Sequence, residues 1–154
     1  MYIFGYRYQD KKPVHCCQGK HTVLNQTAEY ALRVMVYLAG HNDGARVRAP
    51  ELVKALKIPA GYLAKVLHQL AREGLLESQR GKTGGFRIAR DPRRVMLADI
   101  VEPFDAGSSR SGCLLGRATC SDRAPCAAHA KWKAVSAAHT AFFGTTSLGA
   151  IASR

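Results

Sequence analysis

The first half of the chain carries apolar residues at spacings of three and four, a period that predicts amphipathic helices. Three segments show this period, and capping or turn-forming residues bound each of them. We therefore expect helices from about Leu24 to Ala39, from Pro50 to Leu56 and from Ala60 to Glu73. Asn25 is expected to cap the first helix, and residues 57–59 leave only a short turn between the second and the third.

The same spacing assigns the buried faces of these helices. In the first helix, the expected apolar stripe is Ala28, Ala31, Leu32, Met35 and Ala39. In the third helix, the stripe is Leu63, Val66, Leu67 and Leu70.

A shorter period follows these helices. Leu75–Gln79 and Phe86–Ala89 are predicted to be strands, and the basic, glycine-rich segment 80–85 has the composition of a tight hairpin turn. Three short helices followed by a basic hairpin form the order of a winged helix-turn-helix domain, whose third helix enters the major groove of DNA. The expected fold class is therefore mainly α with a small β-hairpin.

The second half of the chain is organised differently. A short helix over Met96–Phe104 is followed by a loop rich in Gly, Ser and Cys, a last helix over about Ala124–Phe143, and a weak tail. The expected parts are an irregular leader at 1–21, the winged helix-turn-helix domain at 22–104, a cysteine-rich loop at 105–126, and a dimerisation helix with its tail at 127–154.

Charge and composition indicate which kinds of molecule the protein binds and where it is located. Lys and Arg number 23 against 11 Asp and Glu, a net charge of +12, which favours a phosphate-bearing partner such as double-stranded DNA. There is no apolar run of about 18 residues and no signal-peptide pattern, so we expect a cytoplasmic protein with no membrane partner. The five cysteines are then expected to be reduced thiols or metal ligands rather than disulfides.

Side chains suited to DNA contact gather on the third helix and in the hairpin. On the helix these are Ala60, Gly61, Ala64, Lys65 and His68, whose small members allow close approach to the groove and to thymine methyl groups. In the hairpin, Arg80 and Lys82 are expected to contact phosphates or the minor groove. The Gly81-Lys82-Thr83 run is not a nucleotide-binding P-loop, because Leu76 stands where that motif needs a glycine.

Cys113, Cys120 and Cys126 lie in one loop, with six and then five residues between them, and His129 follows. Thiolates are preferred ligands of iron–sulfur clusters and of zinc, and the wide gaps favour a cluster over a zinc knuckle. Three thiolates leave a fourth ligand to come from elsewhere. The alternatives are a zinc-stabilised or cluster-free DNA-binding module and a thiol-dependent enzyme that uses His129. We expect no enzyme, because no third catalytic partner is evident.

Together these features resemble the Rrf-type family of bacterial winged-helix iron–sulfur transcriptional regulators, over about Leu24–Phe143. The segments that carry the resemblance are Glu29-Tyr30-Ala31-Leu32-Arg33, Tyr62-Leu63-Ala64-Lys65-Val66-Leu67, Arg80-Gly81-Lys82-Thr83-Gly84-Gly85-Phe86 and the three-cysteine loop. The resemblance implies a homodimeric repressor that binds a palindromic operator. It also implies a [4Fe–4S] or [2Fe–2S] cluster that senses nitric oxide, redox state or iron status.

Two branches of this family complete the cluster differently. In the NsrR-like branch, the fourth ligand is an acidic residue on the first helix of the partner subunit, and Glu29 stands at that position. In the IscR-like branch it is a histidine three residues after the third cysteine, and His129 stands there. Ala64-Lys65, in place of the Glu-Gln of IscR-like proteins, favours the NsrR-like branch and hence Glu29 and a [4Fe–4S] cluster. The first cysteine gap is one residue longer than in either branch, which leaves the cluster type open.

The last helix is expected to form the dimer. Its large residues follow one stripe, formed by Trp132, Val135, His139 and Phe142. A ridge of small residues follows the same spacing on a neighbouring face, at Ala127, Ala130, Ala134, Ala137 and Ala141. We expect this helix to pack against its two-fold mate beside the cysteine loop.

Overall fold

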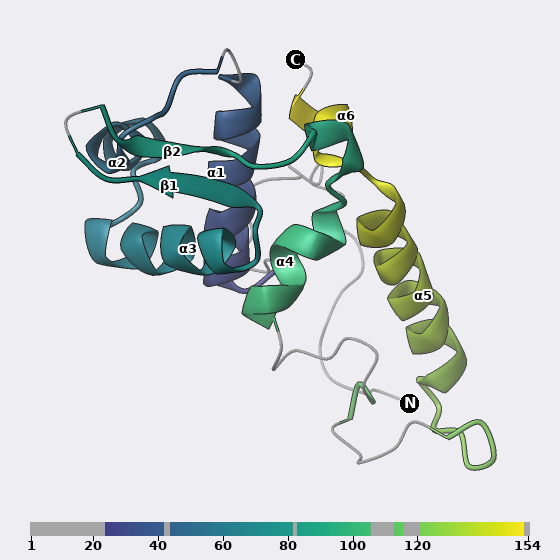
Figure 1. Cartoon of the computed structure of the whole chain (residues 1–154). Helices are drawn as coiled ribbons and strands as arrows, with labels where there is room; N and C mark the ends of the chain where they lie inside the picture. Colours follow the sequence, from purple (N-terminus) through teal and green to yellow (C-terminus); the bar gives the residue numbers. More distant parts are fainter. Residues whose placement is uncertain (1–23, 42–43, 82, 106–112, 116–120, 153–154) are drawn as a thin grey trace, which may run out of the picture.

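The computed structural model describes residues 24–41, 44–81, 83–105, 113–115 and 121–152. Its helices are α1 (Gln26–Gly40), α2 (Ala49–Leu56), α3 (Ala60–Arg72), α4 (Leu97–Asp105), α5 (His129–Thr145) and α6 (Leu148–Ala152), with a short 3-10 helix, η1 (Pro92–Arg94). The strands β1 (Leu76–Gln79) and β2 (Gly85–Ile88) form an antiparallel hairpin (Figure 1). The predicted fold class, mainly α with a small hairpin, is confirmed.

One hydrophobic core holds α3 against the rest of the domain. The four apolar residues predicted on α3, Leu63, Val66, Leu67 and Leu70, are all buried. Burying a side chain of this size contributes about 1.5–3 kcal/mol relative to leaving it exposed. This face therefore fixes the orientation of α3, and the opposite face is turned to solvent.

α1 is the central helix, in contact with α3 on one side and with α4 and α6 on another. Asn25 caps it as predicted, because its side-chain oxygen accepts the N–H of Ala28 at 2.8 Å.

The buried face of α1 differs from the predicted stripe. The expected members Leu32 and Ala39 are only half-buried, whereas Val34 and Leu38 are buried. Val34 and Leu38 lie three or four residues from the buried Ala31 and Met35, so the buried residues still share one face of the helix.

The hairpin pairs β1 with β2 in a register that places Glu77 opposite Arg87. Its turn requires glycine for two separate reasons. A Cβ at Gly84 would lie 2.3 Å from the carbonyl oxygen of Gln79, and Gly81 has a φ of +104°. The glycine-rich segment is therefore a tight turn, as its composition predicts.

The long C-terminal helix differs from the prediction at both ends. α5 begins at His129 rather than at Ala124, because residues 121–128 form turns and bends and the N–H of His129 donates to the carbonyl of Cys126 at 2.9 Å. It continues to Thr145, beyond the predicted end.

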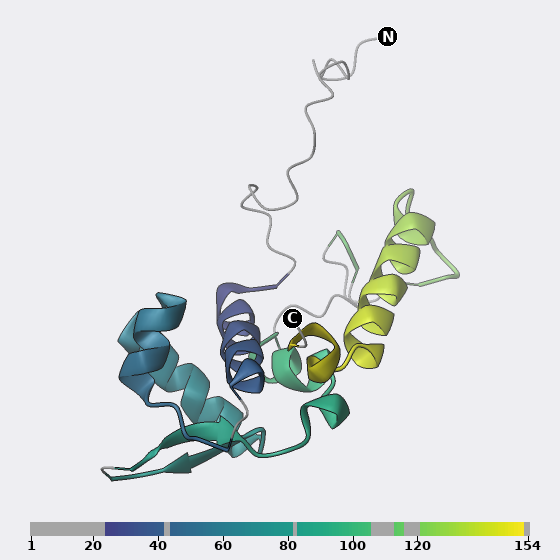
Figure 2. The ribbon, with the colours of Figure 1, turned by 90° about the horizontal axis from the view of Figure 1, so that it is seen from above.

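The segment predicted to be a weak tail forms α6, so that prediction is wrong. Leu148 is fully buried. Its N–H donates to the carbonyl of Val95 at 2.7 Å, and the N–H of Leu97 donates to the carbonyl of Thr146 at 2.9 Å. Figure 2 shows α6 beside α1, with α5 leaning away from the body of the domain. So short a helix is stabilised by packing rather than by its own hydrogen bonds.

None of the helices in the described ranges is both long enough and apolar enough to cross a membrane.

Candidate nucleic-acid interface and cysteine site

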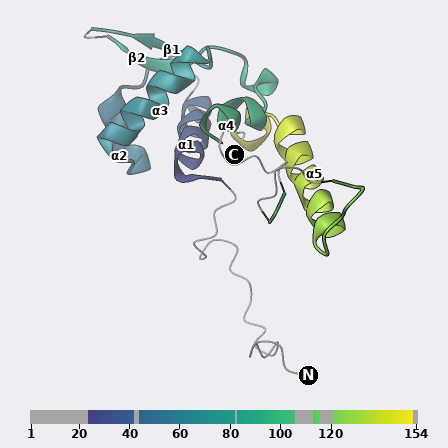
Figure 3. The ribbon, with the colours of Figure 1, turned by 90° about the horizontal axis from the view of Figure 1, so that it is seen from below.

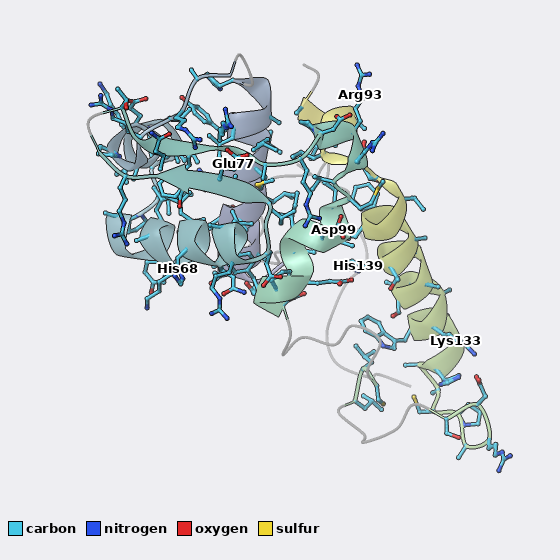
Figure 4. All side chains as sticks on the ribbon, viewed as in Figure 1. His68, Glu77, Arg93, Asp99, Lys133 and His139 are labelled. Carbon is cyan, nitrogen blue, oxygen red and sulfur yellow. The ribbon has the colours of Figure 1, made fainter. Side chains whose placement is uncertain are left out.

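The outward face of α3 carries the residues predicted to contact DNA. Ala60, Gly61, Ala64, Lys65 and His68 are all exposed, and Figure 4 shows His68 pointing away from the core. A Cβ added at Gly61 would meet no atom within 4 Å, so nothing in the fold crowds the start of the helix. Neither Lys65 nor His68 forms an ion pair with the described residues, which leaves both side chains available to a partner.

Tyr62 adds an aromatic side chain that the apolar spacing did not assign to this surface. It is 53% exposed, and its ring stands edge-on to that of Tyr30 in α1, with the ring centres 6.4 Å apart. The Arg33 guanidinium lies 5.8 Å from the centre of the Tyr30 ring. Tyrosine hydroxyls are common phosphate donors. An aromatic residue in the first turn of the helix, just before buried Leu63, is the sequence signal that points to it.

The hairpin concentrates its available positive charge near the tip. Arg80 there is exposed, and Lys82 lies outside the described residues. Farther from the tip, the carboxylate of Glu77 pairs with Arg87 at 2.7 Å and with Arg46 at 3.1 Å. Hydrogen bonds from Arg87 and then Arg46 lower the pKa of Glu77 below its ordinary value. The two arginines therefore share one carboxylate, so the three groups keep one net positive charge, but both guanidinium groups are held within the fold.

Two of the three predicted cluster cysteines lie in the described part of their loop. Cys113 and Cys126 are half-buried thiols that form no disulfide, and Cys120 lies outside the described residues. Among the residues that the structure describes, no three His, Cys, Asp or Glu side chains form a group that could hold a metal ion. Three thiols in one loop nevertheless match the soft donors that iron–sulfur clusters take, so the residues of the complete loop fit such a group.

His129, one candidate for the fourth ligand, is buried and hydrogen-bonded. Its Nε2 lies 2.7 Å from Oδ1 of Asp122, and Nζ of Lys133 donates to both oxygens of the same carboxylate at 2.9 Å. The hydrogen bonds from Lys133 and then from His129 lower the pKa of Asp122. His129 could bind a metal through Nε2 only after it separates from Asp122.

Glu29, the other candidate, lies in the first turn of α1. Its side chain is 42% exposed, and its carboxylate stands 3.8 Å from Arg33 in a long ion pair. The side chain of Asn25 donates to the carbonyl of Phe104 at 2.7 Å, which holds the start of α1 against the end of α4. Glu29 therefore lies near the point where the cysteine loop leaves α4, and its carboxylate is only loosely paired.

The stripe predicted for dimerisation divides between two sides of α5. Val135 and Phe142 are exposed, at 59% and 54%. Trp132 and His139 are half-buried, and the ring of His139 lies 4.6 Å from that of Phe143. Figure 4 shows His139 on the side of α5 that faces α4. Only part of the stripe is thus presented to solvent.

The alanine ridge of α5 is exposed as well, at Ala127, Ala130, Ala134, Ala137 and Ala141. Two of these alanines, with Trp132, line a groove of about 540 Å³ along the helix that reaches Asp122 and His129. Figure 3 shows α5 standing apart from α1 and α3. Within the described part of one chain, α5 therefore leaves two faces uncovered that a partner helix could pack against.

Comparison with known proteins gives concordant matches. The Rrf2 family model, described as "Iron-dependent Transcriptional regulator", matches residues 24–154. A protein of Aquifex aeolicus assigned as an HTH-type transcriptional regulator is 38% identical over 127 residues, which cover 80% of this chain and 88% of the relative. The transcriptional regulator IscR of Xenorhabdus nematophila is 29% identical over 125 residues, which cover 81% and 76%.

Among solved structures, that of CymR (YrzC), described as the global cysteine regulator of B. subtilis, is similar with a TM-score of 0.72 at 20% identity. The match covers 86% of this chain and 98% of CymR. At this level of identity the likeness concerns the fold alone, and it agrees with the winged helix-turn-helix arrangement of α1–α3 and the hairpin.

Proposed function

Because the chain belongs to the Rrf2 family of DNA-binding transcriptional regulators, we propose that it is a homodimeric repressor controlled by an iron–sulfur cluster in the loop between α4 and α5. The position of that loop is the observation that carries the proposal. The loop leaves the end of α4, which is bonded to the start of α1, and it leads into α5, whose exposed faces are suited to a second subunit.

The DNA-reading surface is assigned to α3 and the hairpin. Ala60, Gly61, Ala64, Lys65 and His68 of α3 face the major groove, and Arg80 and Lys82 contact the flanking phosphates. The exposure of the α3 residues and the absence of ion pairs at Lys65 and His68 within the described chain support this assignment. A two-fold dimer that presents two such surfaces reads a palindromic operator.

Cys113, Cys120 and Cys126 are the proposed cluster ligands. The cluster supplies iron–ligand bonds that nitric oxide, oxidants or loss of iron can break. Glu29 of the second subunit is the preferred fourth ligand, because its carboxylate is exposed and its ion pair is long. His129 is less favourable, since it is buried and its Nε2 is hydrogen-bonded to Asp122.

Regulation then follows from what these side chains hold together. Bound thiolates fix the loop, and the fixed loop sets α5 relative to α1 and α4. In the dimer this sets the separation of the two α3 helices at one turn of DNA, about 34 Å. Release of the thiolates frees the loop, the separation is no longer fixed, and repression ends.

Anaerobic purification followed by iron and sulfide analysis tests this function. We expect brown protein whose visible absorption is bleached by nitric oxide, with Mössbauer spectra that identify a [4Fe–4S] cluster. Operator duplexes selected from a random-sequence pool then report affinity. Cys120→Ala should lose both the cluster and operator binding, whereas Cys17→Ala, outside the loop, should change neither. Wild-type protein that lacks iron and sulfide yet binds its operator fully would contradict the proposal.

The two candidates for the fourth ligand are separated by Glu29→Ala and His129→Ala. We expect Glu29→Ala to change the absorption spectrum and to speed the loss of iron in air. His129→Ala should retain the wild-type spectrum. The reverse pattern would assign the ligand to His129.

The alternative function is a regulator that holds zinc or no metal. The CymR structure shares the fold and is described as a cysteine regulator, so the fold alone does not identify the signal. Colourless protein that contains zinc, or no metal, would favour this alternative.

A further inference from the structure

Lys57, in the turn between α2 and α3, has a backbone conformation that lysine rarely adopts. Its φ of 53° and ψ of 37° lie in the left-handed helical region, where the Cβ of an L-residue is crowded. The other positive-φ residues in the described ranges are all glycines, namely Gly44, Gly74, Gly81 and Gly85. Position 57 is thus the exception to a rule that the rest of the described chain follows.

The turn needs this conformation, but it does not need a lysine. The N–H of Lys57 donates to the carbonyl of Val53 at 2.9 Å and ends α2, and Arg33 donates to the carbonyl of Leu56. Ile58, the next residue, is 1% exposed and anchors the turn in the core. At residue 57 itself, the turn therefore uses only the main-chain N–H. Glycine, the usual residue at such a helix end, would make them without the crowding.

The side chain of Lys57 forms no polar contact with the described residues that would offset this cost. It is exposed, and it forms no ion pair or hydrogen bond with the described residues. Neither packing nor a polar contact with the described residues therefore explains a lysine at this position. A strained residue with no role in its own fold points to a role toward a partner.

The location of Lys57 identifies that partner. It stands three residues before Ala60, at the start of α3, whose first turn is exposed and uncrowded at Gly61. When a recognition helix enters the major groove by its N-terminal end, the turn that precedes it lies beside the phosphates at the edge of the groove. We infer that Lys57 binds a DNA phosphate at the edge of the groove that α3 enters. This inference rests on the DNA-facing surface of the proposed function.

Salt-dependent binding to a mixed-sequence duplex of about 30 base pairs, measured by fluorescence anisotropy, tests this contact. Lys57→Gly and Lys57→Asn keep the backbone conformation accessible and remove the charge. Both should weaken binding about fivefold and reduce the slope of log K against log salt by about one. Lys57→Arg should restore the affinity and the slope. Lys57→Gly should also raise the melting temperature by a few degrees, about the effect of relieving one strained residue.

The matched control is Arg94→Gln in η1. Arg94 is exposed, and its neighbour Arg93 lies at the opposite end of the domain from His68 in Figure 4. This variant should keep the wild-type slope. If Lys57→Gly melts higher but binds with unchanged affinity and slope, the lysine is merely tolerated in the turn and the inference is overturned. Wild-type protein that binds no duplex at low salt would overturn the proposed function together with the inference, so the two failures are distinguishable.

Discussion

The side chain of Asn25 donates to the main-chain carbonyl of Phe104 at 2.7 Å while its own oxygen accepts the N–H of Ala28 at 2.8 Å. Its Nδ2 also lies 2.9 Å from Oδ1 of Asp105. One residue therefore caps α1 and holds the last turn of α4 in place. Because the cysteine loop begins directly after Asp105, this contact links the DNA-binding domain to the proposed sensor.

Asn25→Ala should lower the free energy of unfolding by about 1–2 kcal/mol, since it removes both the helix cap and the donor to Phe104. Asn25→Asp keeps the cap but places a carboxylate beside Asp105, so an intermediate loss is expected. Urea unfolding followed by circular dichroism measures both. Gln26→Ala, which removes only an exposed hydrogen bond to Tyr30, should cost less than about 0.5 kcal/mol. An Asn25→Ala protein as stable as wild type would show that the hydrogen bonds of Asn25 do not contribute to the free energy of unfolding.

Glu77→Gln should change how stability depends on pH. The pKa of Glu77 in the fold is lowered from its ordinary 4.5, first by the hydrogen bond from Arg87. Because the folded-state pKa is the lower one, the carboxylate stabilises the fold above pH 4.5, and this contribution is lost as the pH falls through the folded-state pKa. Wild type should therefore melt at a higher temperature than the variant at neutral pH, and the two melting temperatures should converge in acid. The difference in melting temperature at neutral pH should shrink in about 1 M salt, because exposed ion pairs are screened at that concentration. An offset that is constant across the pH range would contradict this account.

Substitutions on the two exposed sides of α5 should dissociate the dimer. Phe142→Asp and Ala134→Asp each place a charge on a surface that is exposed within one chain. The fold of the subunit should therefore be retained while its partner is lost. Sedimentation velocity should show monomers with unchanged circular dichroism. Ala55→Asp, at an exposed position of α2, should remain a dimer. If only one α5 variant dissociates, that side alone forms the interface; if neither does, the interface lies elsewhere.

Arg80→Ala should weaken binding to every DNA sequence alike and reduce the salt slope by about one, as expected for a phosphate contact. Anisotropy on the selected operator and on a mixed-sequence duplex compares the two losses. Arg87→Ala is the matched control, because Arg87 is already paired with Glu77 and should contribute less to DNA binding. A loss confined to the operator would instead make Arg80 a base-reading residue.

The parts of the fold that sequence predicts are those that local chemistry determines. The four apolar residues of α3, the Asn25 cap and the glycine turn of the hairpin follow from helical spacing, capping and sterics. α1 shows the limit of this reasoning. The spacing of three and four fits the predicted stripe and also the one that includes the buried Val34 and Leu38. Which of the two is buried depends on where α3, α4 and α6 pack against α1, far apart in the sequence. α6 is too short for its sequence to identify it: Leu148 and Ile151 have a helical spacing, but two residues do not distinguish a helix from a turn.

The candidate site divides in the same way. The exposed face of α3 could be predicted because it is the complement of the buried stripe. The contact of His129 with Asp122 could not, since it depends on the turns of residues 121–128. Lys57 is a sharper case: its residue type is visible in the sequence, but its significance lies in a φ angle that only the fold reveals.

The pairing of Leu97 with Thr146 has a mechanical consequence. Residues 106–145 connect Asp105, at the end of α4, to Thr146, which is bonded to Leu97 at the start of α4. The nine residues of α4 separate those two points by about 13 Å. Both ends of this segment are therefore attached at α4. Because α4 also packs against α1, a change in this segment would act on α4 at both of its ends, and α4 is placed to connect the proposed sensor with the proposed DNA-binding surface.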